Sequence, residues 1–159
     1  MRRKEREVTS FEKIIAIMEK CDVCSLALLD DGYPYVIPLN FGFGETEGKV
    51  NLYFHGAGSG KKMELLQKNP NVAFSMDCSH RLITGERACD ATMEYESVCG
   101  RGNMQVLKQP EVKQHALRCI MQHYTGRNDD VFSERELAAV TVLQCTVQEI
   151  SGKAWSKRK

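Results

Sequence analysis

Hydrophobic residues recur along this chain at two spacings, and each spacing predicts a type of element. Apolar residues three and four positions apart, the spacing of one helical face, follow Ser10 and again follow Pro110. The first helix is expected to begin after Ser10, whose hydroxyl is a good N-cap, and to end near Lys20. Another helix begins near Gly60 and stops at Asn69-Pro70.

The other apolar runs predict short β-strands. We expect strands over residues 23–29, 33–43, 49–55, 72–76, 93–98, 104–107 and 140–150, with a polar, irregular loop that has strand edges over 78–91. Turn signals at Asp30-Asp31-Gly32 and Glu45-Thr46-Glu47-Gly48 make two hairpins in succession, which favours an antiparallel meander. Pro34 and Pro38 restrict their strand to a sheet edge or a bulge. The predicted fold class is mainly β, a six- or seven-stranded antiparallel sheet closed into a small barrel with about three helices outside.

Length and charge narrow the class of protein. The 159 residues suit a single domain over 1–159, which ends in a basic tail from Gly152 to Lys159 that contains Trp155. A formal net charge of +1 argues against a nucleic-acid partner. There is no run of about 18 apolar residues, which argues against a membrane span. Met1-Arg2-Arg3-Lys4 is followed by Glu5 and not by an apolar segment, so a cytoplasmic location is expected.

Seven cysteines, an odd number, do not indicate a disulfide framework in such a chain. Cys21-Asp22-Val23-Cys24 has the spacing of half a zinc site, but no second pair follows it. Cys78, His80 and Cys89 could supply three metal ligands, although their spacing matches none of the usual zinc patterns. Buried or half-buried free thiols are the favoured interpretation.

The segment Leu52–Lys62 is the strongest indication of a ligand. An apolar strand passes into three glycines within five residues and then into Lys61 and Lys62 at a helix start. Free N–H groups and the helix dipole favour an anion there, and glycine lets a phosphate approach the backbone. The segment does not fit a Walker A loop, because His55 and Lys62 replace the required Gly and Ser/Thr, and it also lacks the dinucleotide fingerprint. The alternative is a solvated helix start.

Two further features have both a functional and an ordinary interpretation. In the segment Tyr33–Gly42, Pro38 leaves a neighbouring carbonyl without a hydrogen bond in the sheet, and the Asn40 side chain offers both a donor and an acceptor. These groups could bind a planar heterocycle, but an ordinary edge strand with a proline has the same sequence features. His55, just before the glycines, is a candidate acid or base or a packing residue. We interpret His115 and His123, on the helix that opens at Pro110, as a surface or interface pair.

Together and in this order, these segments resemble the flavin-binding split-barrel superfamily typified by pyridoxamine 5′-phosphate oxidase. Within it, the chain is similar to the branch of nitroimidazole resistance proteins. The matching residues are Tyr33–Phe41, Leu52–Ala57 with Gly60-Lys61-Lys62, Tyr95–Val98, Gly102 and Ser151-Gly152-Lys153. The resemblance covers about residues 8–155, nearly the whole chain.

The resemblance implies a homodimer of split barrels with two flavin sites at the subunit interface. FMN is the usual cofactor, with FAD as the alternative. By this resemblance, the phosphate would be held by Gly60, Lys61 and Lys62, and the isoalloxazine ring would meet Pro38, Leu39 and Asn40. The ribityl chain and the ring edge would lie along His55, Gly56 and Ala57, with Ser97 and Val98 nearby. Trp155 would cover the site from either subunit.

The activity implied by the resemblance is reduction of nitro groups on nitroimidazole-type small molecules, with NADH or NADPH as electron donor and His55 as the catalytic residue. A flavin-binding or storage protein without turnover is one alternative. A pyridoxamine 5′-phosphate oxidase-like enzyme is a weaker one, because the C-terminal segment lacks the expected arginines and histidines. A metal- or haem-binding regulator that uses Cys78, His80 and Cys89 also stays open.

Overall fold

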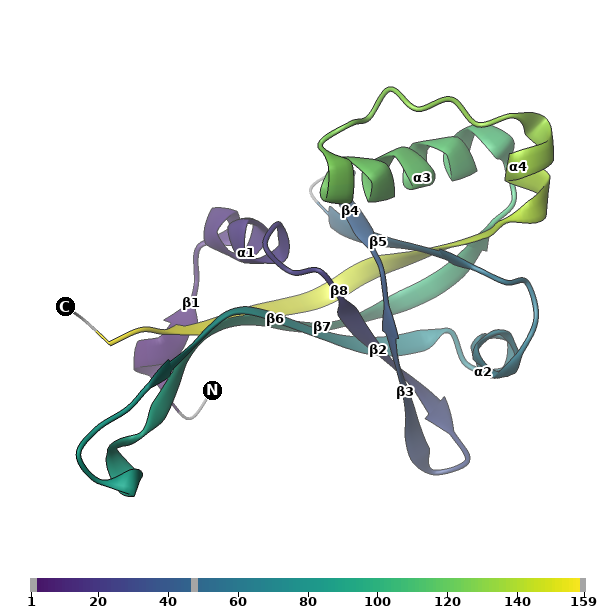
Figure 1. Ribbon diagram of the computed structural model, residues 1–159. Coiled ribbons are helices and arrows are strands. Elements are labelled where there is room, and N and C mark those ends of the chain that lie inside the picture. The colour runs from purple at the N-terminus through teal and green to yellow at the C-terminus, as the bar shows by residue number, and fades with distance from the viewer. Residues whose placement is uncertain (1–2, 47–48, 158–159) are drawn as a thin grey trace.

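One antiparallel sheet is the frame of the molecule (Figure 1). The structure, a computed structural model, describes residues 3–46 and 49–157. Within these residues the strand order is β3-β2-β6-β7-β8-β5-β4, and β1 pairs with β8 outside that path. The strands are β1 (Glu7–Val8), β2 (Cys24–Asp30), β3 (Tyr33–Leu39), β4 (Gly42–Thr46), β5 (Lys49–Gly56), β6 (Asn71–Ile83), β7 (Thr92–Leu107) and β8 (Thr141–Trp155).

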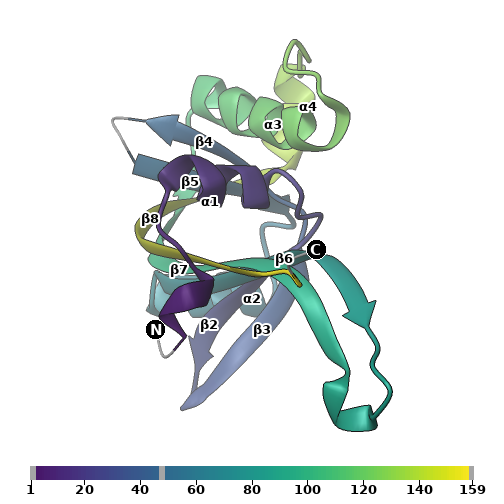
Figure 2. The same cartoon turned by 90° about the vertical axis from the view of Figure 1, so that its left-hand side faces the viewer.

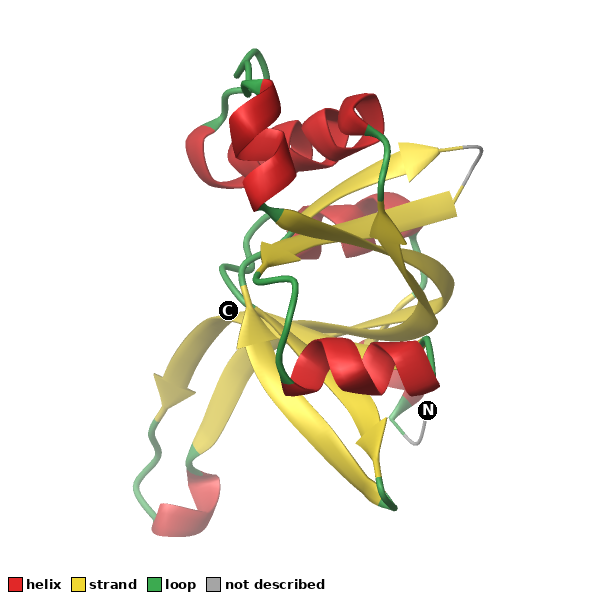
Figure 3. Cartoon of the chain, turned by 90° about the vertical axis from the view of Figure 1, so that its right-hand side faces the viewer, coloured by secondary structure: helices red, strands yellow, loops and turns green. Residues whose placement is uncertain are grey.

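The sheet curls because its two outermost strands follow each other in the sequence. β3 and β4 lie at opposite ends of the strand path, yet only Asn40 and Phe41 separate them. The chain must therefore bring the two edges together, and Figures 2 and 3 show the resulting barrel-like curvature. Phe41 is fully buried at this junction, and its N–H donates to the Tyr124 hydroxyl at 3.0 Å.

Four α-helices occur in the described residues, and they cover different parts of the curled sheet. They are α1 (Phe11–Met18), α2 (Lys61–Lys68), α3 (Pro110–Thr125) and α4 (Glu134–Ala139), with short 3-10 turns η1 (Lys4–Arg6) and η2 (Ala88–Asp90). α3 lies across β4 and β5, with Ala116 and Ile120 buried beneath it, and α4 packs beside α3 (Figure 1). α2 follows β5 at the far end of the sheet from β1. No helix among the described residues is long and apolar enough to cross a membrane.

Much of the predicted pattern is confirmed. The Ser10 hydroxyl accepts from the Lys13 N–H at 3.4 Å and so caps α1. α2 ends at Lys68, before Asn69-Pro70. Pro38 lies in β3, an edge strand, as its missing N–H requires. The mainly β antiparallel fold is also confirmed, with seven strands in the main path and β1 beside it. Part of the predicted 45–48 turn, residues 47–48, lies outside the described residues.

The loop predicted over 78–91 is shorter than expected, because its first strand edge is a full continuation of β6. β6 continues to Ile83 and pairs with the start of β7 in a hairpin that projects from the body (Figure 1). Side chains from Ser79 to Leu82 are exposed on both faces, so no alternation marks them as a strand. The expected break between 98 and 104 is also wrong, since β7 runs through it with an irregularity between Arg101 and Gly102.

The prediction that a basic tail begins at Gly152 is wrong, because residues 152–155 belong to a strand. β8 continues through Gly152 and ends at Trp155, which pairs with Tyr95 of β7. Its last residues are polar or small, so they carry no apolar alternation in the sequence. α4 was also not predicted, although the Ser133 hydroxyl caps it by accepting from the Glu136 N–H at 3.3 Å. All seven cysteines are free thiols, but Cys89 and Cys99 are exposed, so the prediction of buried or half-buried thiols is wrong for these two.

Candidate functional site

The loop between β5 and α2 holds the Lys62 ammonium against the backbone. A Cβ added to Gly56 would lie 2.9 Å from Lys62 Nζ, and one added to Gly58 would lie 2.8 Å from Thr141 Oγ1. Gly56 thus leaves room for the Lys62 ammonium beside the backbone, and Gly58 leaves room for the Thr141 hydroxyl. Lys62 is half-buried, and burial lowers the pKa of its ammonium; within the described residues no carboxylate pairs with it. A desolvated cation without a counter-charge is costly, and a bound anion would remove that cost.

Lys61 has a different environment from Lys62. Its ammonium lies 2.5 Å from an Asp30 carboxylate oxygen and 5.6 Å from the centre of the Tyr35 ring. The hydrogen bond to Asp30 raises the pKa of Lys61. Lys61 is thus exposed and already paired, so a ligand would share its charge with Asp30. The sequence predicted the two lysines as equal partners, and it missed Asp30 and Tyr35 because both come from the β2–β3 hairpin some thirty residues earlier.

The first turn of α2 has no side-chain cap. Gly60 is its N-cap residue, with φ of +102°, a conformation that favours glycine. Ser10 on α1 and Ser133 on α4 instead accept hydrogen bonds from N–H groups of their helices. The Gly60 carbonyl accepts from the Met63 and Glu64 N–H groups at 2.9 and 3.2 Å. An uncapped N-terminus beside Lys62 fits a phosphate well.

The predicted ring-binding residues lie along the same edge strand as Tyr35. Pro38 is exposed three residues further along β3, which places it about 10 Å from Tyr35 at the rise of a strand. Leu39 turns toward the core, and Asn40 is exposed in the connection to β4. The edge strand therefore leads away from the lysines, and a flavin laid along it could reach from the phosphate site to Pro38.

His55 is the last residue but one of β5, opposite Val142 of β8. Its side chain is exposed, whereas the five residues before it are buried. Gly56 and Ala57 follow it directly into the glycine loop. His55 thus lies beside the glycine loop, next to Gly56 and close to Lys62.

The other predicted residues lie on β7 and β8, away from this loop. Trp155 ends β8 near β1, at the opposite end of the sheet from α2 (Figure 1). The Arg6 guanidinium carbon lies 5.2 Å from the centre of its ring. The Ser97 hydroxyl donates to the Lys153 carbonyl at 3.4 Å, and Val98 is fully buried in the core. One protomer does not bring Trp155 to the lysines.

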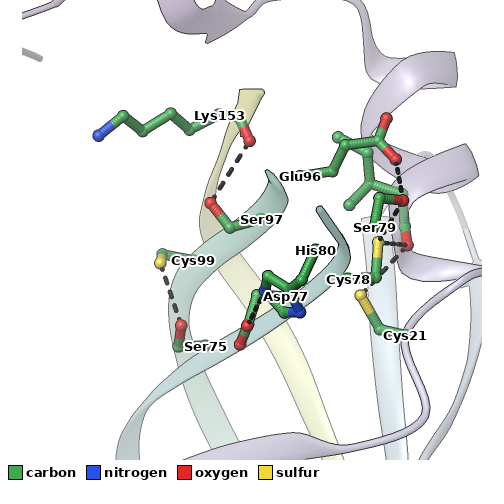
Figure 4. Close-up of polar contacts among 11 residues, drawn as sticks. Cys21, Ser75, Asp77, Cys78, Ser79, His80, Glu96, Ser97, Cys99 and Lys153 are labelled. Carbon is green, nitrogen blue, oxygen red and sulfur yellow. Dashed lines mark hydrogen bonds and ion pairs between the residues drawn. The ribbon is translucent and has the colours of Figure 1, made fainter. Parts of the chain in front are cut away.

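A polar group on β6 was not predicted as a site. A β-bulge lies between Cys78 and Arg81, where Ser79 and His80 together oppose Tyr95. His80 Nε2 lies 2.7 Å from Asp77 Oδ2 (Figure 4). Ser79 has a φ of +59°, a backbone conformation that costs about 1–3 kcal/mol in a residue other than glycine. No sequence signal marks this bulge.

The structure separates the three candidate metal ligands. The buried Cys78 thiol points toward the Ile17 carbonyl, and Cys89 lies in η2 beside Asp90. His80 pairs with Asp77. In the part of the chain that is described, no three His, Cys, Asp or Glu side chains gather closely enough to hold a metal ion. The set Cys78, His80 and Cys89 is therefore wrong as a metal site.

Residues 10–154 match the family described as pyridoxamine 5′-phosphate oxidase. The chain belongs to this family. The predicted family is thus confirmed, and with it the flavin-binding character of the fold. Proteins of this family are typically dimeric. No curated protein matches the chain.

Solved structures give the same fold. A candidate 5-nitroimidazole antibiotic resistance protein from Bacteroides thetaiotaomicron is 34% identical, with a TM-score of 0.78 over 92% of this chain and 85% of that one. The flavocytochrome Anf3 from Azotobacter vinelandii is 19% identical, with a TM-score of 0.79 over 99% and 72% of the two chains. The FAD and heme binding protein from Mycobacterium smegmatis is 20% identical, with a TM-score of 0.78 over 97% and 77%. At identities near 20% the likeness shows the fold alone.

Proposed function

We propose that this protein is an FMN-dependent reductase that acts on nitro groups of nitroimidazole-type compounds. The observation that carries the proposal is the half-buried Lys62 ammonium, which has no carboxylate partner in the described residues and lies beside Gly56 at the uncapped start of α2. This arrangement suits a phosphate monoester. FMN ends in such a group, whereas FAD continues into a second nucleotide.

In this proposal the phosphate is held by Lys62, the N–H groups of the first turn of α2 and, more weakly, Lys61. The ring lies along β3 against Pro38, Leu39 and Asn40, and the ribityl chain passes His55, Gly56 and Ala57. When bound, the flavin supplies hydride transfer. The chain's own residues fix its position, and His55, predicted as the catalytic residue, lies in this proposal beside the phosphate and the ribityl chain and not beside the ring.

A second copy of the chain completes the site. Trp155 lies at the end of β8 that pairs with β1, and in this proposal Trp155, Ser97 and the backbone at Val98 reach the flavin bound by a partner subunit. The edge strand supports this, because Tyr33, Val36 and, on β2, Leu29 are 79%, 55% and 58% exposed. An apolar edge of this kind is suited to contact with another protein surface. Light scattering should give a dimer mass, and a monomer in the presence of FMN would contradict this part.

Flavin titration followed by anaerobic reduction tests the function. The purified protein should bind one FMN per chain, and NADH or NADPH should bleach the bound flavin. Addition of a 5-nitroimidazole should restore the flavin absorbance while the drug is consumed. Failure to bind FMN would overturn the cofactor proposal. Binding without bleaching or drug consumption would favour a storage protein.

A further inference from the structure

The contact between Asp77 and His80 exists because of the bulge in β6. In a regular strand, residues 77 and 80 would point to opposite faces of the sheet, since side chains alternate. The bulge places Ser79 and His80 together opposite Tyr95 and so resets the alternation. His80 Nε2 thereby comes to lie 2.7 Å from Asp77 Oδ2.

Two neighbouring elements hold the bulge in place. The Ser79 hydroxyl donates to Glu96 Oε2 of β7 at 2.6 Å (Figure 4). The Lys20 ammonium, which follows α1, donates to the same oxygen at 2.8 Å. The first bond ties Ser79, whose φ is +59°, to β7, and the second holds the Glu96 carboxylate that accepts it. The strained backbone at Ser79 is therefore bonded to a carboxylate that is itself held by Lys20, and the structural consequence of the bulge is the position of the His80 imidazole.

The placement has no evident structural use. The side chains of Asp77 and His80 are 59% and 50% exposed, and an ion pair so exposed adds little to stability. Backbone strain that is held in place without a gain in stability is characteristic of functional sites. The pair also has the composition of an acid–base dyad, in which a carboxylate accepts from one imidazole nitrogen and leaves the other for a ligand.

The dyad opens onto a groove next to the proposed flavin strand. The groove, of about 400 Å³, is lined by Lys20, Asp22, Val23, Ser25, Asp77, Cys78, Ser79 and His80. Ser25 of β2 pairs with Pro38 on one side and with Ser75 of β6 on the other. Adjacent strands lie about 4.8 Å apart, so the groove begins one strand away from Pro38. A molecule in the groove would lie beside a ring placed along β3.

We infer that His80, oriented by Asp77, donates a proton to the nitro compound reduced at the flavin site. This inference rests on the proposed function. A nitro group takes up a hydride, here from the reduced flavin, and one proton, here from His80; an N–O bond breaks, and the products are a nitroso compound and water. His80 then regains its proton from solvent through its exposed side. Lys20 and Asp22 are the other charged residues that line the groove, and Lys20 is engaged with Glu96.

The test separates flavin reduction from substrate reduction. FMN-loaded wild-type protein and the variants His80→Gln, His80→Ala and Asp77→Asn are reduced anaerobically and mixed with a 5-nitroimidazole in a stopped-flow spectrometer. His115→Gln, an exposed histidine on α3, is the matched control. All variants should bind FMN and be reduced as the wild type is, since none touches the Lys62 loop. Reoxidation by the nitro compound should fall about 100-fold or more in His80→Gln and about tenfold in Asp77→Asn.

Added imidazole should restore part of the rate in His80→Ala, which a merely structural residue would not allow. Reoxidation within twofold of wild type in both His80→Gln and Asp77→Asn would overturn the inference while leaving the reductase intact. Protein that fails to bind FMN, or wild-type protein that never reduces the nitro compound, would instead remove the proposed function, and this inference with it.

Discussion

The Lys61 ammonium lies 2.5 Å from the Asp30 carboxylate, while Lys62, the next residue, has burial as the only cause of its pKa shift. Two adjacent lysines at one helix start therefore differ in what they can offer an anion. The charge of Lys61 is already shared with a carboxylate, and that of Lys62 is available. Substitutions can separate the two roles.

Lys62→Ala should weaken FMN binding by more than tenfold, because a charge-assisted hydrogen bond contributes about 1.5–3 kcal/mol. Lys61→Ala should weaken it by about threefold or less, since an exposed, paired charge contributes about 0–1 kcal/mol. Fluorescence quenching of FMN gives both dissociation constants. Lys68→Ala, at the other end of α2, is the control. A larger loss in Lys61→Ala than in Lys62→Ala would refute this assignment.

Gly56→Ala should reduce FMN affinity while leaving the fold intact. The added Cβ would come 2.9 Å from Lys62 Nζ, the far end of a flexible side chain, which can move aside and so leave the phosphate position. We expect an affinity loss of about tenfold, similar to removal of one hydrogen bond. At Gly44 an added Cβ would have ordinary contacts at 3.6 Å, so Gly44→Ala serves as the control. Unchanged FMN affinity in Gly56→Ala would contradict the placement of Lys62.

Gly42→Ala should be strongly destabilising. A Cβ on Gly42 would collide with the backbone of Cys119 and Ile120 in α3, and backbone cannot rotate away as a side chain can. Overpacking of this kind costs about 1–3 kcal/mol or more. Each kcal/mol lowers the Tm of a domain of this size by about 2–4 °C. Differential scanning calorimetry measures the change; a Tm equal to that of wild type would mean that α3 does not lie against β4 as described.

Acid should destabilise the protein partly through Glu96. Hydrogen bonds from Lys20 and Ser79 lower the pKa of Glu96, so its carboxyl binds a proton less readily in the folded than in the unfolded chain. The resulting stability is complete above the ordinary glutamate pKa of 4.5 and is lost as pH falls through the lowered value. Glu96→Gln should therefore have a lower Tm than wild type at about pH 6 and a smaller decrease in Tm on going to about pH 3.5.

Thermal melts across that range test the prediction, with Glu64→Gln, on the exposed face of α2, as the control. Parallel curves for Glu96→Gln and wild type would show that the Lys20–Glu96–Ser79 contacts do not contribute.

The sequence predicted those parts of the fold in which local chemistry decides the structure. The Ser10 cap, the stop at Asn69-Pro70 and the edge position of Pro38 each depend on a residue and its immediate neighbours. The glycine loop before Lys62 was identified for the same reason. Family membership followed from the order of such local motifs.

The parts that were missed depend on contacts across the sheet. The difference between Lys61 and Lys62 requires Asp30, which only the fold brings near. The extended β6–β7 hairpin has exposed residues on both faces, so its strands lack apolar alternation. The bulge at Ser79 forms a hydrogen bond to Glu96 on another strand, and no feature of the local sequence predicts the bulge.

The position of β8 affects how the chain is made. This strand is the last in the sequence, yet it lies inside the sheet between β7 and β5 and also pairs with β1. A nascent chain on the ribosome that lacks β8 therefore has β5 and β7 with open hydrogen-bonding edges, and it cannot join the two halves of the sheet until β8 has been made. Pairings as distant as Glu7 with Lys153 close late and slowly. During that interval the unfinished sheet is the species most exposed to aggregation and most dependent on chaperones.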